Sequence, residues 1–367
     1  VIPFQNWTNT ALTLTGLPEE RSLDGVTTNA QGKLIISESL ENFEEDAFVT
    51  IINKGGRCNI FFPYDLWEWK NPLPSGKDMW DIWGTTPNNV YMVGLDGAIQ
   101  RYNGTTIESM LSPTVNHLCD LWGSSDTNIY AVGYYGTIIK YNGTRWRTMK
   151  SPTTETIYGI WGSSPDNVIC VGDNGLILNY NGTTWSKIES GVPYRLNAVW
   201  GSSASNIFAV GSDKTGGGGV VMYYNGSTWV YQGKPSTYAF NDIFGFSANE
   251  VYAVNGWSEV FKYNGSTWSK VVNLNGSGFS SIWGTSGTNL YAVGFNGKRY
   301  WYNGTTWNLL ANDISWHCSA VWGTSNSDVF ISGSTNNIHH FNGTSWKLIN
   351  SITCDSFKDI WGSSATD

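Results

Sequence analysis

The chain has 367 residues, of which 14% are charged and 15% aromatic, and its formal net charge is −8 at pH 7. Because lysine and arginine are few and do not cluster, this balance argues against binding to nucleic acid or to an anionic membrane surface. No apolar stretch is long enough to cross a membrane as a helix, and we expect no membrane insertion.

The first 46 residues lie outside any internal repeat. Two short runs, residues 11–15 and 33–37, have the composition of strands and are separated by turn-like sequence. A segment of this size buries too little apolar surface to be stable alone. We therefore predict that residues 1–46 form a β-rich arm or small subdomain, and that the protein self-associates by adding this arm to a neighbouring subunit.

One unit recurs, with intervals of 39 residues except for one longer interval, from residue 83 to residue 361. Its markers are a Trp-Gly pair, an Asn-Gly-Thr/Ser triplet and a Trp shortly after the triplet. A fixed period near 40 residues indicates one supersecondary unit copied in series. The aromatic residues of the first marker are Trp83, Trp122, Trp161, Trp200, Phe244, Trp283, Trp322 and Trp361.

A single unit, residues 120–149, contains four short apolar runs separated by turn sequences. None of them is long enough for a helix, and the Asn-Gly pair predicts a tight hairpin of type I′. The pattern predicts an all-β fold, a β-propeller of four-stranded blades. We expect the repeated Trp side chains to fill the core between blades, because large flat rings suit the gap between twisted sheets.

The two ends of the chain each resemble part of a unit. Residues 47–70 resemble strands two to four, and residues 357–362 resemble strand one. With the seven complete units these ends make eight blades, closed by pairing the last strand with the amino-terminal ones, which would remove exposed edges. We therefore predict an arm, 1–46, and an eight-bladed propeller, 47–367. The alternative is seven blades with residues 1–75 as a separate domain.

The motif WGSSxxNIYAVGxxGTIxxYNGTxW resembles a large group of microbial repeat propellers, related in pattern to the kelch and WD40 types, over residues 47–367. This resemblance implies the fold and little about function, because propellers host many unrelated activities. Sialidase-like propellers carry an S-x-D-x-G-x-x-W box, whereas the equivalent hairpins here read Y-N-G-T-x-W. That departure, with no visible arginine triad, disfavours a propeller glycoside hydrolase.

The sequence lacks G-x-S-x-G, H-E-x-x-H and C-x-x-C motifs. We therefore expect no enzyme activity, no catalytic residue, no cofactor and no metal site. One repeated set of carboxylates, Asp81, Asp120, Asp242 and Asp359, stands two residues before the Trp or Phe of strand one. These side chains could ring the central channel and hold a cation or a sugar hydroxyl. Solvated or capped strand ends are the favoured interpretation, since half of the units lack the Asp.

The Asn-Gly-Thr/Ser hairpins serve either as turns or as acceptors for N-glycosylation. The turn alone explains seven of the motifs, all of which are expected on one face of the disc. The turn interpretation is favoured, unless the protein is secreted and its source is archaeal or eukaryotic, in which case we expect glycosylation. The candidates, with two sites outside the repeat, are Asn6, Asn103, Asn142, Asn181, Asn225, Asn264, Asn275, Asn303 and Asn342.

Five cysteines are present, without metal-type spacing. In the eight-blade arrangement Cys58 and Cys354 fall on one face of the composite blade, where a disulfide would lock the ring. A bridge from Cys318 to Cys354 competes with it, and five reduced thiols are the remaining possibility, because the redox compartment is only inferred.

Two classes of function stay open. The arm favours a non-catalytic structural or adhesion protein, with the propeller as an interaction disc. The Thr-, Asn- and Ser-rich composition is typical of an extracellular or cell-surface protein. The repetition favours a glycan-binding lectin with sites between blades, since repeated shallow sites give avidity. Its candidate ligand contacts are Trp257, Trp301 and Trp316, which lie outside the repeat positions, although packing is the commoner role of such residues.

Overall fold

The computed structural model describes residues 77–350, apart from 215–216, 275–277, 311–314 and 335–336, together with the backbone of six strands before residue 62. The chain divides into two compact units, Val1–Asn71 and Pro72–Asp367. This division lies later in the chain than the predicted boundary between residues 46 and 47. Within the described residues no helix is both long enough and apolar enough to cross a membrane.

The N-terminal unit contains a four-stranded sheet in the order β2-β1-β5-β6 and a two-stranded ladder of β3 with β4. β1 coincides with the predicted strand at residues 11–15, and it pairs antiparallel with β5. The segment that was predicted to start the composite blade therefore pairs with β1. The strands are β1 (Ala11–Thr15), β2 (Arg21–Ser22), β3 (Thr27–Thr28), β4 (Leu34–Ile35), β5 (Phe48–Asn53) and β6 (Gly56–Phe61).

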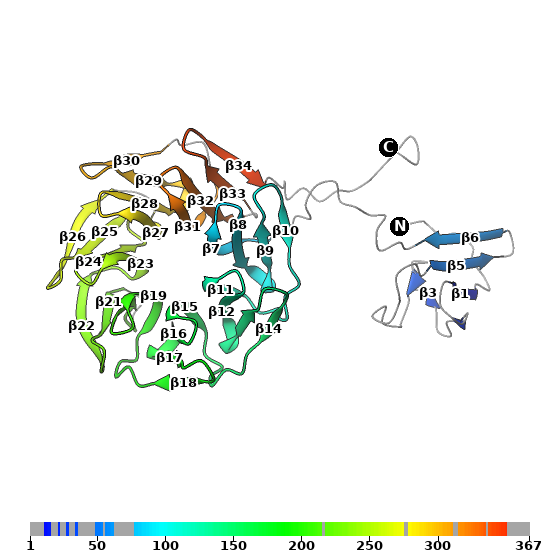
Figure 1. Ribbon diagram of the computed structural model, residues 1–367, viewed down its shortest axis with the longest axis horizontal. Helices are drawn as coiled ribbons and strands as arrows, with labels where there is room; N and C mark the ends of the chain where they lie inside the picture. Colours follow the sequence, from blue (N-terminus) through cyan, green and yellow to red (C-terminus); the bar gives the residue numbers. More distant parts are fainter. Residues whose placement is uncertain are drawn as a thin grey trace. The chain divides into compact units, whose positions relative to one another are not determined.

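Residues 79–350 form seven antiparallel sheets of four consecutive strands, arranged as the blades of a ring (Figure 1). The predicted β-propeller of four-stranded blades is thus confirmed. The innermost strands are β7 (Met79–Thr86), β11 (Leu118–Ser125), β15 (Ile157–Ser164), β19 (Arg195–Ser203), β23 (Phe240–Ser247), β27 (Phe279–Ser286) and β31 (Cys318–Ser325). The second strands are β8 (Asn89–Gly94), β12 (Asn128–Gly133), β16 (Asn167–Gly172), β20 (Asn206–Ser212), β24 (Glu250–Asn255), β28 (Asn289–Gly294) and β32 (Asp328–Gly333).

The third and fourth strands complete each blade toward its outer edge. The third strands are β9 (Ile99–Tyr102), β13 (Ile138–Tyr141), β17 (Ile177–Tyr180), β21 (Gly219–Tyr224), β25 (Glu259–Tyr263), β29 (Arg299–Tyr302) and β33 (Ile338–Phe341). The outer strands are β10 (Ile107–Ser109), β14 (Trp146–Thr148), β18 (Trp185–Ile188), β22 (Trp229–Ser236), β26 (Trp268–Asn273), β30 (Trp307–Leu309) and β34 (Trp346–Asn350).

Buried apolar side chains form one core cluster at each interface between neighbouring blades of the described propeller. The Trp of the Trp-Gly pair belongs to this contact. A Cβ added to Gly123 would lie 2.6 Å from Cη2 of Trp83, so the ring of one blade rests on the glycine of the next. Trp146 and Trp185 are also buried, at 5% and 7% exposed. The prediction that the repeated Trp residues pack between blades is confirmed for these positions.

The ring closes between β31 and β7. A Cβ on Gly84 would lie 2.8 Å from Cη2 of Trp322, which repeats the contact of Trp83 on Gly123. One core cluster also joins Met79 and Met92 to Phe330.

The prediction of eight blades with mixed closure is therefore wrong, and the seven-blade alternative is confirmed. The last described blade contacts the first one directly and leaves no gap for a composite blade. The predicted closing strand, 357–362, lies outside the described residues.

The Asn-Gly hairpins join the third and fourth strands of the blades, but they are not type I′ turns. In the second blade Gly143 has φ 89°, whereas Asn142 keeps negative φ. The sign pattern is that of a type II′ turn, in which the first central residue is glycine. The Asn142 side chain accepts hydrogen bonds from the backbone N–H of Thr144 and Arg145, at 3.1 and 3.0 Å. The asparagine therefore stabilises the turn through its side-chain oxygen.

The two faces of the disc carry different connections. We call entry face the one that holds the turns between second and third strands and the segments that lead into each innermost strand. The hairpin face is the opposite one, which holds the Asn-Gly hairpins and the turns between first and second strands. Four of the entry-face turns are short 3₁₀ segments, namely η2 (Leu95–Gly97), η3 (Tyr134–Gly136), η4 (Asp173–Gly175) and η5 (Phe295–Gly297).

Candidate functional site at the channel mouth

Each innermost strand carries a β-bulge at the same position. In β19, for example, Leu196 pairs with Gly211 and Ala198 with Val210, so that Asn197 is an extra residue. A bulge turns a side chain out of the regular alternation and is frequent beside functional sites. All the bulged residues line the central channel, and they are Trp80, Cys119, Tyr158, Asn197, Asn241, Ser280 and Ser319.

This position varies strongly in an otherwise regular repeat. The residue three places before the Trp or Phe of the Trp-Gly marker is aromatic, thiol, amide or hydroxyl, while the residue that precedes it is hydrophobic and buried in every blade. None of these seven residues was among the predicted site residues. The signal that would have found them is the variability of one column within an internally repeated scaffold.

In three blades the residue after the bulged one is an Asp whose carboxylate accepts a hydrogen bond from the backbone of the neighbouring blade. The N–H of Leu121 donates to Asp81 Oδ2 at 3.0 Å, and the N–H of Ile160 donates to Asp120 Oδ2 at 2.7 Å. Asp242 accepts the N–H of Ile282 in the same way at 2.9 Å. These Asp side chains therefore act as inter-blade acceptors, which agrees with the capped-strand interpretation. The fourth predicted carboxylate, Asp359, lies outside the described residues.

Burial raises the pKa of all three carboxyls. For Asp242 it raises the pKa to about 6. The pKa of Asp120 is raised well above its ordinary value, first by burial and then by the charge of Asp81. The pKa of Asp81 is raised by burial as well. The channel, whose cavity measures about 110 Å³, therefore holds less negative charge than three ordinary carboxylates would. Among the described residues no group of three or more His, Cys, Asp and Glu side chains could hold a metal ion.

Above the carboxyls, the channel opens on the entry face into a cavity of about 350 Å³. Its wall combines aromatic rings with amides and one cation. The ring of Trp80 lies 5.9 Å from that of Tyr134 between centroids, and the Arg195 guanidinium lies 3.8 Å from the centroid of Tyr158. We call this cavity the channel mouth; its lining residues are Trp80, Cys119, Tyr134, Tyr158, Arg195, Asn197 and Asn241.

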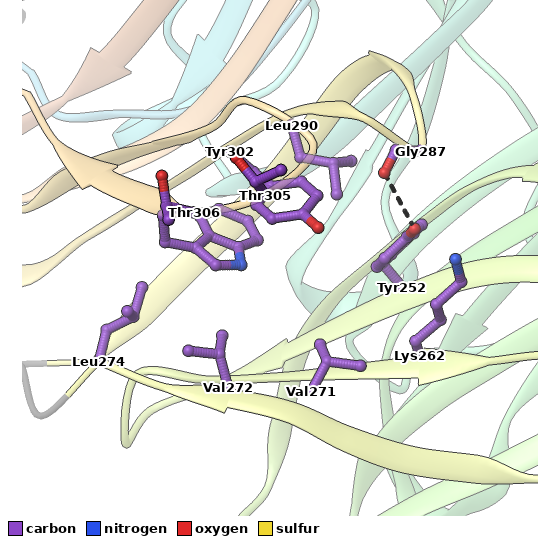
Figure 2. Close-up of a pocket in the computed structure, with 11 residues that line it drawn as sticks. Tyr252, Lys262, Val271, Val272, Leu274, Gly287, Leu290, Tyr302, Thr305 and Thr306 are labelled. Carbon is purple, nitrogen blue, oxygen red and sulfur yellow. Dashed lines mark hydrogen bonds between the residues drawn. The ribbon is translucent and has the colours of Figure 1, made fainter.

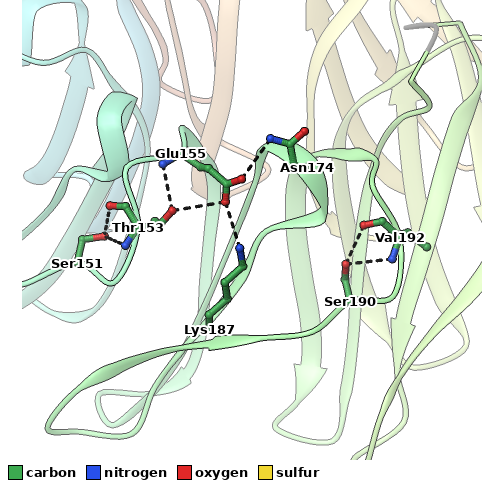
Figure 3. Close-up of polar contacts among 7 residues, drawn as sticks. All are labelled: Ser151, Thr153, Glu155, Asn174, Lys187, Ser190 and Val192. Carbon is green, nitrogen blue, oxygen red and sulfur yellow. Dashed lines mark hydrogen bonds and ion pairs between the residues drawn. The ribbon is translucent and has the colours of Figure 1, made fainter.

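Polar contacts hold the entry-face segments beside the mouth in place (Figure 3). Glu155, which precedes β15, accepts a hydrogen bond from Asn174 Nδ2 at 3.2 Å and pairs with Lys187 at 3.5 Å. The hydroxyl of Ser151 donates to the carbonyl of Thr153 at 3.2 Å. These bonds fix η4 and the segment entering β15, so the mouth is bordered by ordered backbone.

Exposed apolar side chains gather on the entry face. Leu111 and Val115 are 94% and 82% exposed, and Tyr135, Trp257 and Phe295 are 71%, 57% and 42% exposed. All five lie in turns or connections of this face. Among the described residues, the hairpin face shows no exposed large hydrophobic side chain, and the others of this kind lie on outer strands.

Tyr135 has an unusual backbone conformation. Its φ is 57°, in the left-handed region. The equivalent turn residues Asp96, Asn174 and Asn296 are of the types that tolerate this region. An exposed tyrosine there costs conformational energy without gaining burial, which points to a role in binding.

The three predicted ligand-contact tryptophans do not form one site. Trp257 is exposed and stacks on Tyr238, with ring centroids 4.8 Å apart. Trp301 is half-buried and donates from Nε1 to Asn289 at 3.1 Å. Trp316 is half-buried in the same core cluster as Trp301. Of the three, Trp257 has a free aromatic surface.

A lateral groove of about 450 Å³ lies between the fifth and sixth blades. Val271 and Val272 face Tyr302 and Thr305 across it (Figure 2). The Tyr252 hydroxyl closes its inner end by donating to the carbonyl of Gly287 at 3.4 Å. The groove occupies the kind of inter-blade position that the lectin hypothesis requires.

The seven predicted glycosylation sites of the Asn-Gly hairpins lie on the hairpin face. Asn142, Asn181, Asn225, Asn264, Asn303 and Asn342 are exposed and Asn103 is half-buried, while Asn6 and Asn275 lie outside the described residues. Their glycosylation stays a prediction.

The cysteines provide no described disulfide. Cys119 lies in the channel mouth, and burial raises the pKa of its thiol to about 12. Cys170 and Cys318 are buried. The side chain of Cys58 and the whole of Cys354 lie outside the described residues, so the predicted bridge between them stays a prediction.

No protein-family model matches the chain, and no curated protein matches it. Solved structures do match. "YCF48 bound to D1 peptide" has a TM-score of 0.61 and 14% identity, covering 74% of this chain and 93% of its own. "YCF48 from Cyanidioschyzon merolae" has a TM-score of 0.59 and 15% identity, with 74% and 97% covered. The WD40 β-propeller domain of Doa1 has a TM-score of 0.59 and 11% identity, with 71% and 92% covered.

The chain shares the β-propeller fold of these structures. At such low identity the likeness shows the fold alone. It agrees with the resemblance to repeat propellers that the sequence motif indicated.

Proposed function

We propose that this chain is a non-catalytic interaction propeller whose entry face binds a peptide or a protein. The observation that carries the proposal is the chemical difference between the two faces. The entry face presents Tyr135, Trp257 and Phe295 around a polar and aromatic mouth, whereas the hairpin face is polar. Exposed apolar surface bordered by polar groups marks interaction sites, and rigid aromatic side chains are frequent anchors there.

Two further observations support it. The structure titled "YCF48 bound to D1 peptide" has a similar fold and, by its title, holds a peptide. The buried Asp side chains of the channel serve as acceptors between blades, which gives them a structural role in place of a catalytic one.

We further propose an extracellular or cell-surface location and an adhesive or structural role. The exposed Asn-Gly hairpins and the composition support the location. Peptide mapping of protein from its native source would test it. Glycans at several of the hairpin asparagines would support secretion, and bare asparagines at all of them would remove the glycoprotein part of the proposal.

Self-association through residues 1–46 is proposed as the route to assembly. The sheet β2-β1-β5-β6 ends on β2, which lies within residues 1–46, and an edge strand gains backbone partners by pairing with a strand of a neighbour. Sedimentation of the full chain and of a chain lacking residues 1–46 would test this. Oligomers or polymers that vanish on truncation support it, and identical monomers overturn it.

The entry-face proposal can be tested with a bead-displayed library of random decapeptides and a matched pair of variants. One variant carries Tyr135→Ser, Trp257→Ser and Phe295→Ser. The control carries Val230→Ser, Val271→Ser and Leu309→Ser, which removes exposed apolar side chains from outer strands. We expect the first variant to lose peptide capture and the control to keep it.

Equal capture by both variants would overturn the assignment to the entry face. A glycan array tested in parallel addresses the lectin alternative. Glycan binding that depends on Val271 or Trp307 would move the site to the lateral groove.

A further inference from the structure

We propose that the channel mouth recognises a carboxylate on the bound peptide, with Arg195 as the group that binds it. This inference rests on the proposed function, because the peptide is the partner of the entry face. It assigns a ligand chemistry to one cavity within that face.

Arg195 is the first residue of β19 and is exposed. Its guanidinium carbon lies 3.8 Å from the ring centroid of Tyr158, so the cation stacks on the aromatic face. Stacking uses the face of the guanidinium and leaves the N–H groups at its edge available. Tyr158 is itself held, because its hydroxyl donates to Asp173 Oδ2 at 3.3 Å. The cation is therefore oriented before any ligand arrives.

Within the part of the chain that the structure describes, no ion pair joins Arg195 to a carboxylate. Two other cations near the entry-face segments are paired with carboxylates. Lys77 lies 3.7 Å from Asp96, and Lys187 lies 3.5 Å from Glu155. Arg195 is the one cation among the residues that line the channel mouth. A fork of N–H donors held at a cavity wall matches the geometry of a carboxylate.

The surrounding charges favour a singly charged anion. The Asp173 carboxylate accepts a hydrogen bond from the Tyr158 hydroxyl, and three carboxyls, whose negative charge burial reduces but does not abolish, lie deeper in the channel. A phosphate dianion would be repelled by this negative charge, and the single positive charge of Arg195 would balance only one of its two negative charges. A single carboxylate is matched by Arg195, and the aromatic wall formed by Trp80 and Tyr134 suits the apolar atoms next to it.

Asn197 contributes to the wall of the mouth rather than to ligand binding. Its Nδ2 donates to the carbonyl of Phe240 at 2.6 Å and joins two blades, and its Oδ1 is buried beneath the surface of the cavity. The N–H donors that a ligand can reach are therefore those of the exposed Arg195 guanidinium.

The carboxylate can come from a free C-terminus or from an acidic side chain, and the experiment separates these sources. Three bead-displayed decapeptide libraries are used. The first has free C-termini and no Asp or Glu, the second has amidated C-termini with Asp and Glu included, and the third is amidated and free of Asp and Glu. Capture is compared for the unmodified protein, Arg195→Gln, Arg195→Lys and Lys150→Gln. Lys150 is an exposed cation at the same face that does not line the mouth, so its variant controls for net charge.

We expect Arg195→Gln to lower binding of carboxylate-bearing peptides by about 10- to 100-fold, the range for a charge-assisted hydrogen bond. Arg195→Lys should recover part of this loss, because an ammonium attracts the anion without the planar fork. Lys150→Gln should change binding less than about twofold, as expected for a screened surface charge. Asp173→Asn should strengthen binding. Preference for the first or the second library identifies the source of the carboxylate.

Peptides captured equally by the unmodified protein and Arg195→Gln would overturn this inference. If that capture still depended on Tyr135, Trp257 and Phe295, the proposed function would stand. Capture from none of the three libraries would overturn both. Because Arg195 is exposed, its variants should melt like the unmodified protein, and a thermal scan of each checks that lost binding is not lost folding.

Discussion

Closure of the ring by one pair of residues can be tested with a double-mutant cycle. The pair is Gly84 in the first blade and Trp322 in the last. In Gly84→Ala the new Cβ would lie 2.7 Å from the carbonyl oxygen of Asn89 and 2.8 Å from Cη2 of Trp322. Both distances are shorter than real Cβ atoms show, so we expect a loss of roughly 1–3 kcal/mol from overpacking. Trp322→Ala removes a large ring from the interface and should cost about 3–5 kcal/mol.

The double variant distinguishes direct contact between the first and last blades from closure through an eighth blade. Without the Trp322 ring, the alanine at position 84 loses one of its two clashes, and the two costs should not add. We expect a coupling of at least about 0.5 kcal/mol in the free energy of unfolding, measured by urea denaturation. A control cycle pairs Trp322→Ala with Gly256→Ala, whose Cβ would meet nothing closer than 3.8 Å. Those changes should be additive. Additivity in the Gly84 cycle as well would refute direct contact between the first and last blades.

Four further predictions follow from the same structure. Deleting residues 355–367 should leave the melting temperature unchanged, because β31 already packs on β7; a sharp drop would contradict the seven-bladed ring. Burial raises the pKa of Asp242 to about 6, so the stability that its protonated form contributes is full below pH 4 and is lost as the pH rises through 6, by about 3 kcal/mol in the free energy of unfolding. The variant Asp242→Ser, which copies Ser281 in the next blade, should remove this pH dependence between about pH 4 and 7, as measured by urea denaturation. Cys119, with a pKa of about 12, should alkylate slowly at pH 8 and about tenfold faster per pH unit above it, as followed by mass spectrometry. Asn142→Ala should lose about 1 kcal/mol of stability while Asn142→Asp keeps most of it, because the side-chain oxygen accepts two backbone hydrogen bonds; equal losses would contradict that role.

The blade could be predicted from sequence because its signals are local. Four apolar runs and an Asn-Gly turn lie within one unit of about 39 residues, and each strand pairs with the next one along the chain. The Trp-Gly pair also indicated a core between blades, since a large ring beside a glycine is useful where two sheets approach closely. These features depend on neighbours in sequence or on one adjacent copy.

The number of blades could not be read from the same signals. In a repeat protein each unit contacts only its neighbours, so a period specifies the unit and leaves the closing contact open. The chain ends resembled parts of a unit, and this similarity favoured an eighth blade. The placement of Trp322 against Gly84 decided for seven, and β5 pairs with β1 on one side and with β6 on the other instead.

For the candidate site, too, the sequence determined one part and the tertiary structure the rest. The sequence by itself located Asp81, Asp120 and Asp242 and determined that they share one position of the repeat. That each accepts an N–H of the next blade is a tertiary fact, because the two groups are about 40 residues apart in the chain. The channel mouth depended still more on the tertiary structure. A β-bulge reverses the direction of a side chain, so alternation could not show that Tyr158 and Asn197 face the channel, and only the curvature of the ring brings Arg195 onto Tyr158.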